Sequence, residues 1–289
     1  MNRYLALQKI VETGSFSKAA EALGYTQSAM SQMINSLEKE LSIKLLNRFR
    51  TGAKLTLEGA ELYPYIEKTI YQYLATQEKA KEMKGLETGV IRMGTLASIS
   101  AHWLPGILLE FQTRYPGIEF VIHQGDYTSI QEWIKTGAVD FGFVNPKAVS
   151  GMETIFLKEA PMLAILPENH PLAERKTIPL ETLAQEPFIL LEEGHYYEPL
   201  EAFRSIGTAP NIKYTIHDDY AIMTMVEAGL GVSILAELVL HRTNYRIVLR
   251  PTEPFVTRTV AIGYKDKASL PMASKRFIEC LQSHLSELP

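Results

Sequence analysis

The run FSKAAEALGYTQSAMSQM, residues 16–33, constrains the fold more than any other segment of the chain. Gly24 divides it into two short amphipathic stretches, and glycine tolerates the positive φ with which helices commonly end. Ala20 is small enough for two helices to cross closely, while Met30 and Met33 can hold the second helix against the first. This spacing predicts a helix-turn-helix. The alternative is a helical hairpin with no role in DNA binding.

The segments on either side fit a small helical domain with a wing. Apolar residues at helical spacing predict a first helix that ends at Gly14. We expect Ser17 to cap the second helix and Thr26 or Ser28 to cap the third. Short apolar stretches around the basic loop RFRTGAK predict a β-wing within residues 42–56.

The second helix of this motif has an outward face that is polar but uncharged until Glu38. A face that is merely solvated is usually rich in Glu and Lys, whereas Gln and Asn amides can bond base edges. The basic wing suits phosphate or minor-groove contact. Residues 1–60 carry eight Lys/Arg against five Glu, a net charge of +3, while the remainder is −7. The predicted DNA-contacting residues are Thr26, Gln27, Ser28, Ser31, Gln32, Asn35, Arg48, Arg50 and Lys54.

One long helix is predicted from about residue 56 to residue 84. Its apolar stripe has no evident partner within one chain, so we expect a second copy to cover it. Pro64 predicts either a kink or a later start, because proline removes a backbone hydrogen bond. The stripe consists of Leu62, Ile66, Ile70, Tyr73, Gln77 and Ala80.

After residues 85–89 the pattern changes to strands that alternate with helices. Such alternation predicts an α/β domain whose ligands bind at the carboxyl ends of strands. The turn GTLASISAHWLP exposes hydroxyls and amides that attract anions, so the sequence slightly favours a carboxylate or other small anion as ligand. Strands are expected at VIRMGTL, IEFVIHQG, VDFGFVN, MLAILPE, FILLEE, IKYTIHD, GVSILAE, RIVLR and TVAIGYK, with helices near 101–115, 128–136, 198–206, 219–229 and 272–287. The candidate ligand-binding residues are Thr95, Ser98, Ser100, Thr128 and Asn145, with His195 in the opposite lip formed by residues 193–197.

Other classes of protein find little support. One cysteine, Cys280, excludes an intrachain disulfide and a CxxC pair, and no metal-ligand spacing, P-loop, GxGxxG or GxSxG motif is present. The sequence therefore predicts no enzyme, no cofactor and no metal. No signal peptide or membrane span is evident, which favours a cytoplasmic protein. A solute-binding protein for transport would need export, and an enzyme using the same cleft would need a catalytic constellation.

The run from Ser15 to Gly59 resembles the LysR-type bacterial transcriptional regulators nearly residue for residue, through Leu37-Glu38 and Leu55-Thr56-x-x-Gly59. The resemblance continues through LPGILLEFQTRYPGIEF, PENHPLAERKTIPLETLAQEPFILLEEG and VEAGLGVSILAE. Three positions depart from the family pattern: Ser42 replaces a usual glycine, Leu46 a usual phenylalanine and Gln32 a frequent arginine.

This resemblance implies a two-lobed, periplasmic-binding-protein-like α/β effector domain, preceded by an α-helical winged helix-turn-helix and a long linker helix. It implies an operator in double-stranded DNA, a small-molecule effector, and a dimer through the linker helix that pairs into a tetramer. Ser98 and Thr128 match positions that line the effector cleft in the family. The expected parts are 1–58 for the winged helix-turn-helix, 59–87 for the linker helix and 88–289 for the effector domain, with lobe one at 88–160 and 266–289, lobe two at 161–265, and hinges near Ala160-Pro161 and Lys265.

Overall fold

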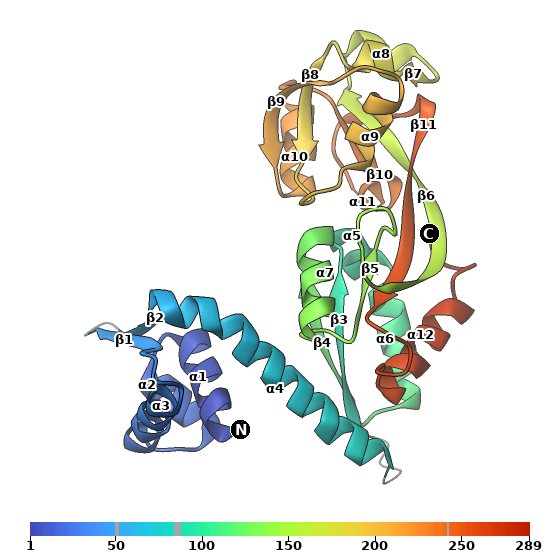
Figure 1. The fold of residues 1–289 in the computed structure, drawn as a ribbon. Coiled ribbons are helices and arrows are strands. Elements are labelled where there is room, and N and C mark those ends of the chain that lie inside the picture. The colour runs from blue at the N-terminus through green and yellow to red at the C-terminus, as the bar shows by residue number, and fades with distance from the viewer. Residues whose placement is uncertain (50–51, 84–87, 242) are drawn as a thin grey trace. The chain divides into compact units, whose positions relative to one another are not determined.

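The computed structural model describes residues 1–49, 52–83, 88–241 and 243–289. Two compact units divide the chain: a head within residues 1–86 and a body within residues 87–289. Figure 1 shows the helices and strands of each unit.

The head is a winged helix-turn-helix, as the sequence predicts. Gly14 and Gly24 end the first two helices at φ +64° and +69°, where a side chain would be strained. Thr26 caps α3, as expected, but Ser15 caps α2 in place of Ser17, because its hydroxyl accepts the Lys18 N–H. The elements are α1 (Asn2–Thr13), α2 (Phe16–Leu23), α3 (Gln27–Leu41), β1 (Leu46–Phe49), β2 (Gly52–Leu55) and α4 (Leu57–Met83).

The long helix α4 corrects two expectations. It begins at Leu57 and includes Pro64, so a helix start beyond the proline is wrong. Ile66 and Ile70 are buried in the core that α1–α3 form, with the Ile70 side chain fully covered. The prediction that the apolar stripe has no partner within the chain is therefore wrong for the N-terminal half of the stripe, which the head core covers. Residues 84–87 of the expected linker lie outside the described residues.

The body is built around one mixed sheet of order β10-β6-β11-β5-β3-β4, with β7 paired to β11. The strands β3, β4 and β5 run parallel, whereas β11 is antiparallel to both β5 and β6. A separate parallel pair joins β8 to β9. The strands are β3 (Gly89–Thr95), β4 (Ile118–Gln124), β5 (Phe141–Val144), β6 (Glu153–Pro167), β7 (Ile178–Pro179), β8 (Pro187–Leu191), β9 (Asn211–Ile216), β10 (Ser233–Ala236) and β11 (Ile247–Tyr264).

The helices of the body lie between these strands, mostly where the sequence predicts them. The expected helix near 101–115 is two helices, since α5 ends at His102 and α6 begins at Leu104. Together with the short 3₁₀ helix η1 (Pro171–Glu174), they are α5 (Ala97–His102), α6 (Leu104–Arg114), α7 (Tyr127–Thr136), α8 (Leu180–Leu183), α9 (Glu198–Ser205), α10 (Asp219–Glu227), α11 (Glu237–Leu240) and α12 (Met272–Ser283).

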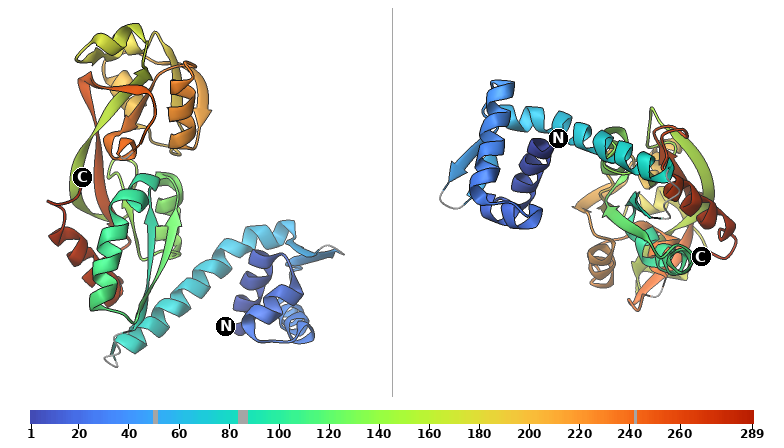
Figure 2. Two further views of the ribbon diagram at one scale, coloured as in Figure 1. Left: turned by 180° about the vertical axis from the view of Figure 1, so that it is seen from behind. Right: turned by 90° about the horizontal axis from the view of Figure 1, so that it is seen from below.

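The body has two hydrophobic cores, and the long antiparallel pair β6–β11 passes through both (Figures 1 and 2). Along β6, Leu157 belongs to the first core and Met162 to the second. Along β11, Val256 belongs to the second core and Val260 to the first. The segments predicted as RIVLR and TVAIGYK are thus one strand. The chain returns to the first lobe near residue 258, and the predicted second hinge at Lys265 is wrong.

Among the described residues, no helix combines the length and the hydropathy that crossing a membrane would require.

Candidate nucleic-acid interface and effector cavity

The outward face of α3 carries the predicted recognition residues. The opposite side of this helix is buried in the core of the head, through Met30, Ile34 and Leu37. On the outward face, Gln27, Ser28, Gln32 and Asn35 are exposed, and Ser31 is half-buried. Thr26 differs from them, because its hydroxyl accepts the Ala29 N–H at 3.2 Å and so caps the helix. The exposed amides on this face can donate to and accept from base edges.

Arg48 of the wing is held against this face. Its Nη1 donates to Ser31 Oγ at 3.3 Å and its Nη2 donates to Asn35 Oδ1 at 3.1 Å. The guanidinium carbon lies 4.3 Å from the ring centre of Phe16, a cation–π contact. Lys54 on β2 is exposed, whereas Arg50 lies outside the described residues. The structure thus brings together three predicted contacts from two elements.

Glu38 is a structural residue of the head whose role was not predicted. Its carboxylate accepts the Leu45 and Leu46 N–H groups at 2.8 and 3.1 Å, and Lys44 Nζ donates to it at 2.8 Å. Burial alone would raise the pKa of Glu38, but these donors and the lysine charge hold it below its usual range. The bonds fix the start of β1 to the C-terminal part of α3, and so set where the wing begins.

A cavity of about 220 Å³ opens in the body at the carboxyl ends of β3, β4, β8 and β9, as the alternating pattern predicts. Its walls come from both lobes, since residues next to each hydrophobic core contribute. The lining residues are Leu96, Ala97, Ser98, Gln124, Gly125, Asp126, Met162, Leu191, Glu192, Glu193, His217, Asp219, Ala236, Val239 and Arg258.

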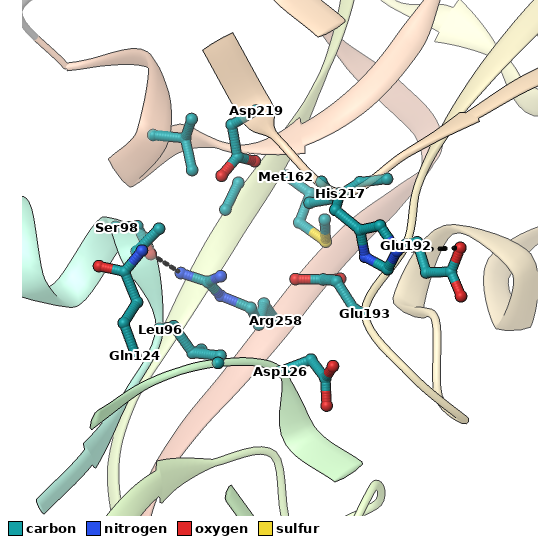
Figure 3. A pocket seen from close by; sticks show the side chains of 15 residues that line it. Leu96, Ser98, Gln124, Asp126, Met162, Glu192, Glu193, His217, Asp219 and Arg258 are labelled. Carbon is teal, nitrogen blue, oxygen red and sulfur yellow. Dashed lines mark hydrogen bonds and ion pairs between the residues drawn. The ribbon is translucent and has the colours of Figure 1, made fainter. Parts of the chain in front are cut away.

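Arg258 occupies the middle of this cavity wall, with Ser98 and Gln124 on one side and Glu193 on the other (Figure 3). Only 3% of its surface is exposed. Its Nη2 donates to Ser98 Oγ at 3.0 Å, while its buried Nε has no hydrogen-bond partner. A buried guanidinium normally has its donors satisfied, so Arg258 is well placed to bind an anionic group.

Two acidic groups of the cavity have perturbed pKa values. Burial, reinforced by Glu198, raises the pKa of Glu193 to about 8, although the Arg258 charge opposes the shift. Burial also raises the pKa of Asp219 to about 6, again against Arg258. Such shifts concentrate where proteins bind or transform ligands.

Of the predicted ligand residues, the structure places Ser98 and Ser100 at cavities. Ser98 lines the main cavity, and both serines line an adjoining one of about 260 Å³. The other four, Thr95, Thr128, Asn145 and His195, line neither of these two cavities, so their role in binding stays a prediction. The side-chain polar groups of three of them bond within the protein: Thr95 is fully buried and its hydroxyl accepts from Ser100 at 3.4 Å, Thr128 Oγ1 accepts the His195 N–H at 3.0 Å, and Asn145 Nδ2 donates to Glu198 Oε1 at 2.9 Å.

The sequence reasoning placed Glu193 in the opposite lip of the cleft but missed the other charged residues of the cavity, namely Asp126, Glu192, Asp219 and Arg258. Glu192 directly follows β8, and Asp219 follows β9, so the rule that ligands bind at strand ends could have found them. Arg258 carried a weaker signal, as a lone charge in the strand pattern VTRTV. Its side chain is buried beside Ser98, 160 residues away in the chain, and the sequence does not reveal this packing.

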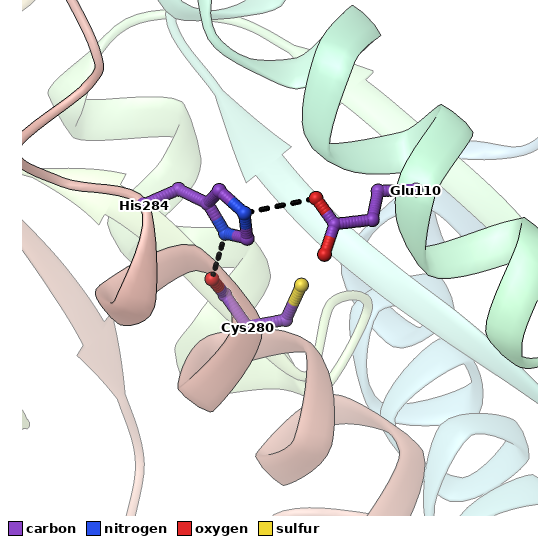
Figure 4. A group of neighbouring side chains, drawn as sticks. All are labelled: Glu110, Cys280 and His284. Atoms are coloured by element: carbon purple, nitrogen blue, oxygen red, sulfur yellow. Dashed lines mark hydrogen bonds and ion pairs between the residues drawn. The ribbon is translucent and has the colours of Figure 1, made fainter.

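A second cluster combines side chains of the kind that bind metals: Glu110 of α6, with Cys280 and His284 at the end of α12 (Figure 4). Its ligand atoms lie within 4.8 Å of one another. His284 Nε2 lies 2.8 Å from Glu110 Oε2, and its Nδ1 lies 2.8 Å from the Cys280 carbonyl. The bond to the carbonyl and the Glu110 charge raise the pKa of His284. The resulting ion pair between His284 and Glu110 explains why these side chains lie together, so no metal ion is needed to explain the cluster.

Family comparisons cover both units of the chain. Residues 1–60 match the model described as bacterial regulatory helix-turn-helix protein, lysR family, and residues 84–286 match the LysR substrate binding domain. The HTH-type transcriptional regulator YvbU of Bacillus subtilis is 34% identical over 274 residues, which cover 94% of each chain.

Solved structures of similar proteins share the fold. A full-length OxyR variant from Pseudomonas aeruginosa has a TM-score of 0.73 at 24% identity, covering 99% of this chain and 97% of that one. CbnR, described as a LysR family transcriptional regulator, has a TM-score of 0.72 at 18% identity, covering 98% of each chain. The relatives are transcriptional regulators and not enzymes.

Proposed function

Because this chain belongs to the LysR family of bacterial transcriptional regulators, we propose that its head reads an operator through α3 and the wing, while the cavity around Arg258 binds the effector. The buried guanidinium carries the second part of this proposal. An arginine that is 3% exposed, with an unpaired Nε beside a cavity, costs stability in the free protein, and a bound anionic group would offset that cost.

On the DNA side, the proposed base readers are the exposed amides of Gln27, Gln32 and Asn35. Arg48 supports the proposal because it joins the wing to α3 through Ser31 and Asn35, and so holds both elements in one interface. Lys54 supplies a phosphate contact, which adds affinity without sequence preference.

On the effector side, binding regulates DNA affinity only if the effector prefers one arrangement of the protein. The cavity suits this role, because its walls come from both lobes and meet where β6 and β11 cross between them. Closing the lobes on a small molecule would then alter the geometry of an assembled regulator.

We also propose that the protein acts as a dimer through α4 and forms tetramers by pairing of dimers. The exposed apolar side chains of α4 support this assignment: Leu57 is 77% exposed, Tyr65 70% and Tyr73 36%. Large apolar groups this exposed on a helix favour association. Since its operator lies on the bacterial chromosome, we place the protein in the cytoplasm.

The test is selection of genomic DNA fragments by the purified full-length chain, followed by binding assays on the selected fragment. We expect one or a few fragments to be strongly enriched, and expect a pool of small metabolites to change the affinity or the footprint. Uniform recovery of all fragments would overturn the proposed DNA function. Enrichment that no metabolite alters would overturn the effector role.

A further inference from the structure

Three buried side-chain atoms of the described residues lack a hydrogen-bond partner, and all three belong to one neighbourhood. They are Glu198 Oε2, Asp219 Oδ1 and Arg258 Nε. Asp219 and Arg258 line the main cavity, and the Glu198 charge acts on Arg258 and on Glu193. Most buried polar groups are paired, and an unpaired one costs about 1–3 kcal/mol. The unpaired set contains two acceptors and one donor, so one cavity offers both kinds of site.

The cavity wall carries side chains of opposite charge. Four carboxylates line it, those of Asp126, Glu192, Glu193 and Asp219, together with the single guanidinium of Arg258. Among the described residues, no ion pair connects Arg258 to any of them. In Figure 3 the guanidinium lies between Asp219 on one side and Asp126 on the other, with Glu193 facing it. A small molecule can therefore reach a cationic group and several anionic groups at once.

We propose that the effector is a small zwitterion, in which a carboxylate binds Arg258 and Ser98 while an ammonium group binds the surrounding carboxylates. This inference rests on the proposed function, since it names the chemical class of the effector for the same cavity. A guanidinium binds a carboxylate through two parallel hydrogen bonds. Asp219, with its unpaired Oδ1, and Glu193 are the acceptors for the ammonium group.

Molecules of one charge fit this cavity poorly. A simple anion would satisfy Arg258 but also face the ionised carboxylates among the four acidic side chains, whereas a simple cation would meet those carboxylates and be repelled by Arg258. The sequence favoured a carboxylate as the ligand, and the proposed zwitterion has a carboxylate at one end only. A volume of about 220 Å³ suits a metabolite of amino-acid size and not an extended cofactor.

The protonation of the acidic groups supports the same ligand class. Burial raises the pKa of Glu193 to about 8 and that of Asp219 to about 6, so near neutral pH the first is largely protonated. An ammonium group beside them favours their ionised forms and lowers both pKa values. Binding of a zwitterion should therefore release protons.

The experiment uses three matched pools and the full-length chain: the standard L-amino acids, the amines that lack their carboxylates, and the acids that lack their amino groups. We expect the amino-acid pool alone to raise the thermal unfolding midpoint. Calorimetry of the active compound in two buffers of different ionisation enthalpy should then show proton release at pH 7.

Two matched variants locate the ammonium site. Asp219→Asn should weaken binding of the active amino acid by roughly tenfold, which corresponds to about 1.4 kcal/mol. Asp218→Asn should leave it within roughly twofold, because Asp218 is exposed outside the cavity and asparagine also caps α10. Equal effects of the two variants would contradict the proposed contact.

The outcomes separate this inference from the proposed function. Stabilisation by the acid pool or by the amine pool to the same extent would overturn the zwitterion, as would no response to any pool. Neither result affects selective DNA binding, which is measured on its own. A protein that binds amino acids but selects no DNA fragment would instead overturn the proposed regulator.

Discussion

Arg258 and Ser98 lie 160 residues apart in the sequence, yet the guanidinium Nη2 of the arginine donates a 3.0 Å hydrogen bond to the serine hydroxyl. The bond links β11, which crosses between the lobes, to the first turn of α5, the helix that follows β3. Ser98 was predicted to bind the ligand directly. In the structure its hydroxyl also positions the group that we expect to do so.

Ser98→Ala should therefore destabilise the body, since it removes a partner from a buried charge. We expect a loss of about 1–3 kcal/mol in the free energy of unfolding. Urea unfolding monitored by the fluorescence of the two tryptophans, Trp103 and Trp133, reports on the body. Ser100→Ala is the control, because its hydroxyl makes only a long 3.4 Å contact with Thr95. Equal losses in both variants would argue against a special role for the Arg258 bond.

The raised pKa of Glu193 predicts how the stability of the body depends on pH. Its pKa of about 8 in the folded protein exceeds the ordinary value of 4.5, owing to burial and to Glu198, Asp219 and Asp126, with Arg258 opposing. Between these two values the folded state binds more protons than the unfolded state. This group therefore makes stability fall as pH rises from about 4.5 to about 8, with no further loss above.

Thermal unfolding of the full chain across this pH range checks the prediction. Glu193→Gln should flatten the decline between pH 6 and pH 8, because a glutamine cannot ionise. Glu181→Gln, a change at an exposed position on α8, should leave the curve as in the wild type. Parallel curves for wild type and Glu193→Gln would show that Glu193 does not cause the decline.

Ser42 provides a stabilising prediction in the head. It ends α3 at φ +54°, a left-handed conformation that costs an L-residue about 1–2 kcal/mol. The sequence flagged this position, since the family pattern has glycine there. Ser42→Gly should raise the stability of the head by roughly 0.5–1 kcal/mol. Ala22→Gly, at an exposed interior position of α2, should lower it by about 1 kcal/mol. Far-ultraviolet circular dichroism measures both changes, and destabilisation by Ser42→Gly would refute the strain argument.

Self-association should depend on the exposed face of α4. Replacing Tyr65 and Tyr73 by lysine should dissociate the dimer, because these side chains are 70% and 36% exposed on the helix that we assign to the interface. Thr76→Lys, at an exposed polar position of the same helix, is the control. Sedimentation at micromolar concentration measures the effect. A monomeric wild type would contradict the assignment. Ile70 is unsuitable for this test, since it lies fully buried in the head core.

The sequence was most informative where local rules apply. Gly14, Gly24 and Thr26 end or begin helices as expected, because capping depends on a few neighbouring residues. It was least informative about long-range packing. The burial of Ile70 in the head core and of Arg258 beside Ser98 depends on segments far apart in the chain.

The same distinction explains the predicted effector residues. Hydroxyls and amides near strand ends were expected to face a ligand, but Thr128 and Asn145 bond other parts of the protein. A short polar side chain can form its hydrogen bonds with neighbouring protein groups at little cost. The buried charges of Arg258 and Asp219 do not, and they leave unpaired atoms in the cavity wall.

We claim that α3 reads base sequence, and the ratio of affinities for the selected fragment and for random DNA tests this. Gln27→Ala should lower this ratio, because a good amide–base contact contributes about 1–3 kcal/mol of discrimination. Lys54→Ala should weaken binding to both DNAs alike and reduce the salt slope by about one. Gln27→Ala binding that falls equally on specific and random DNA would contradict the claim.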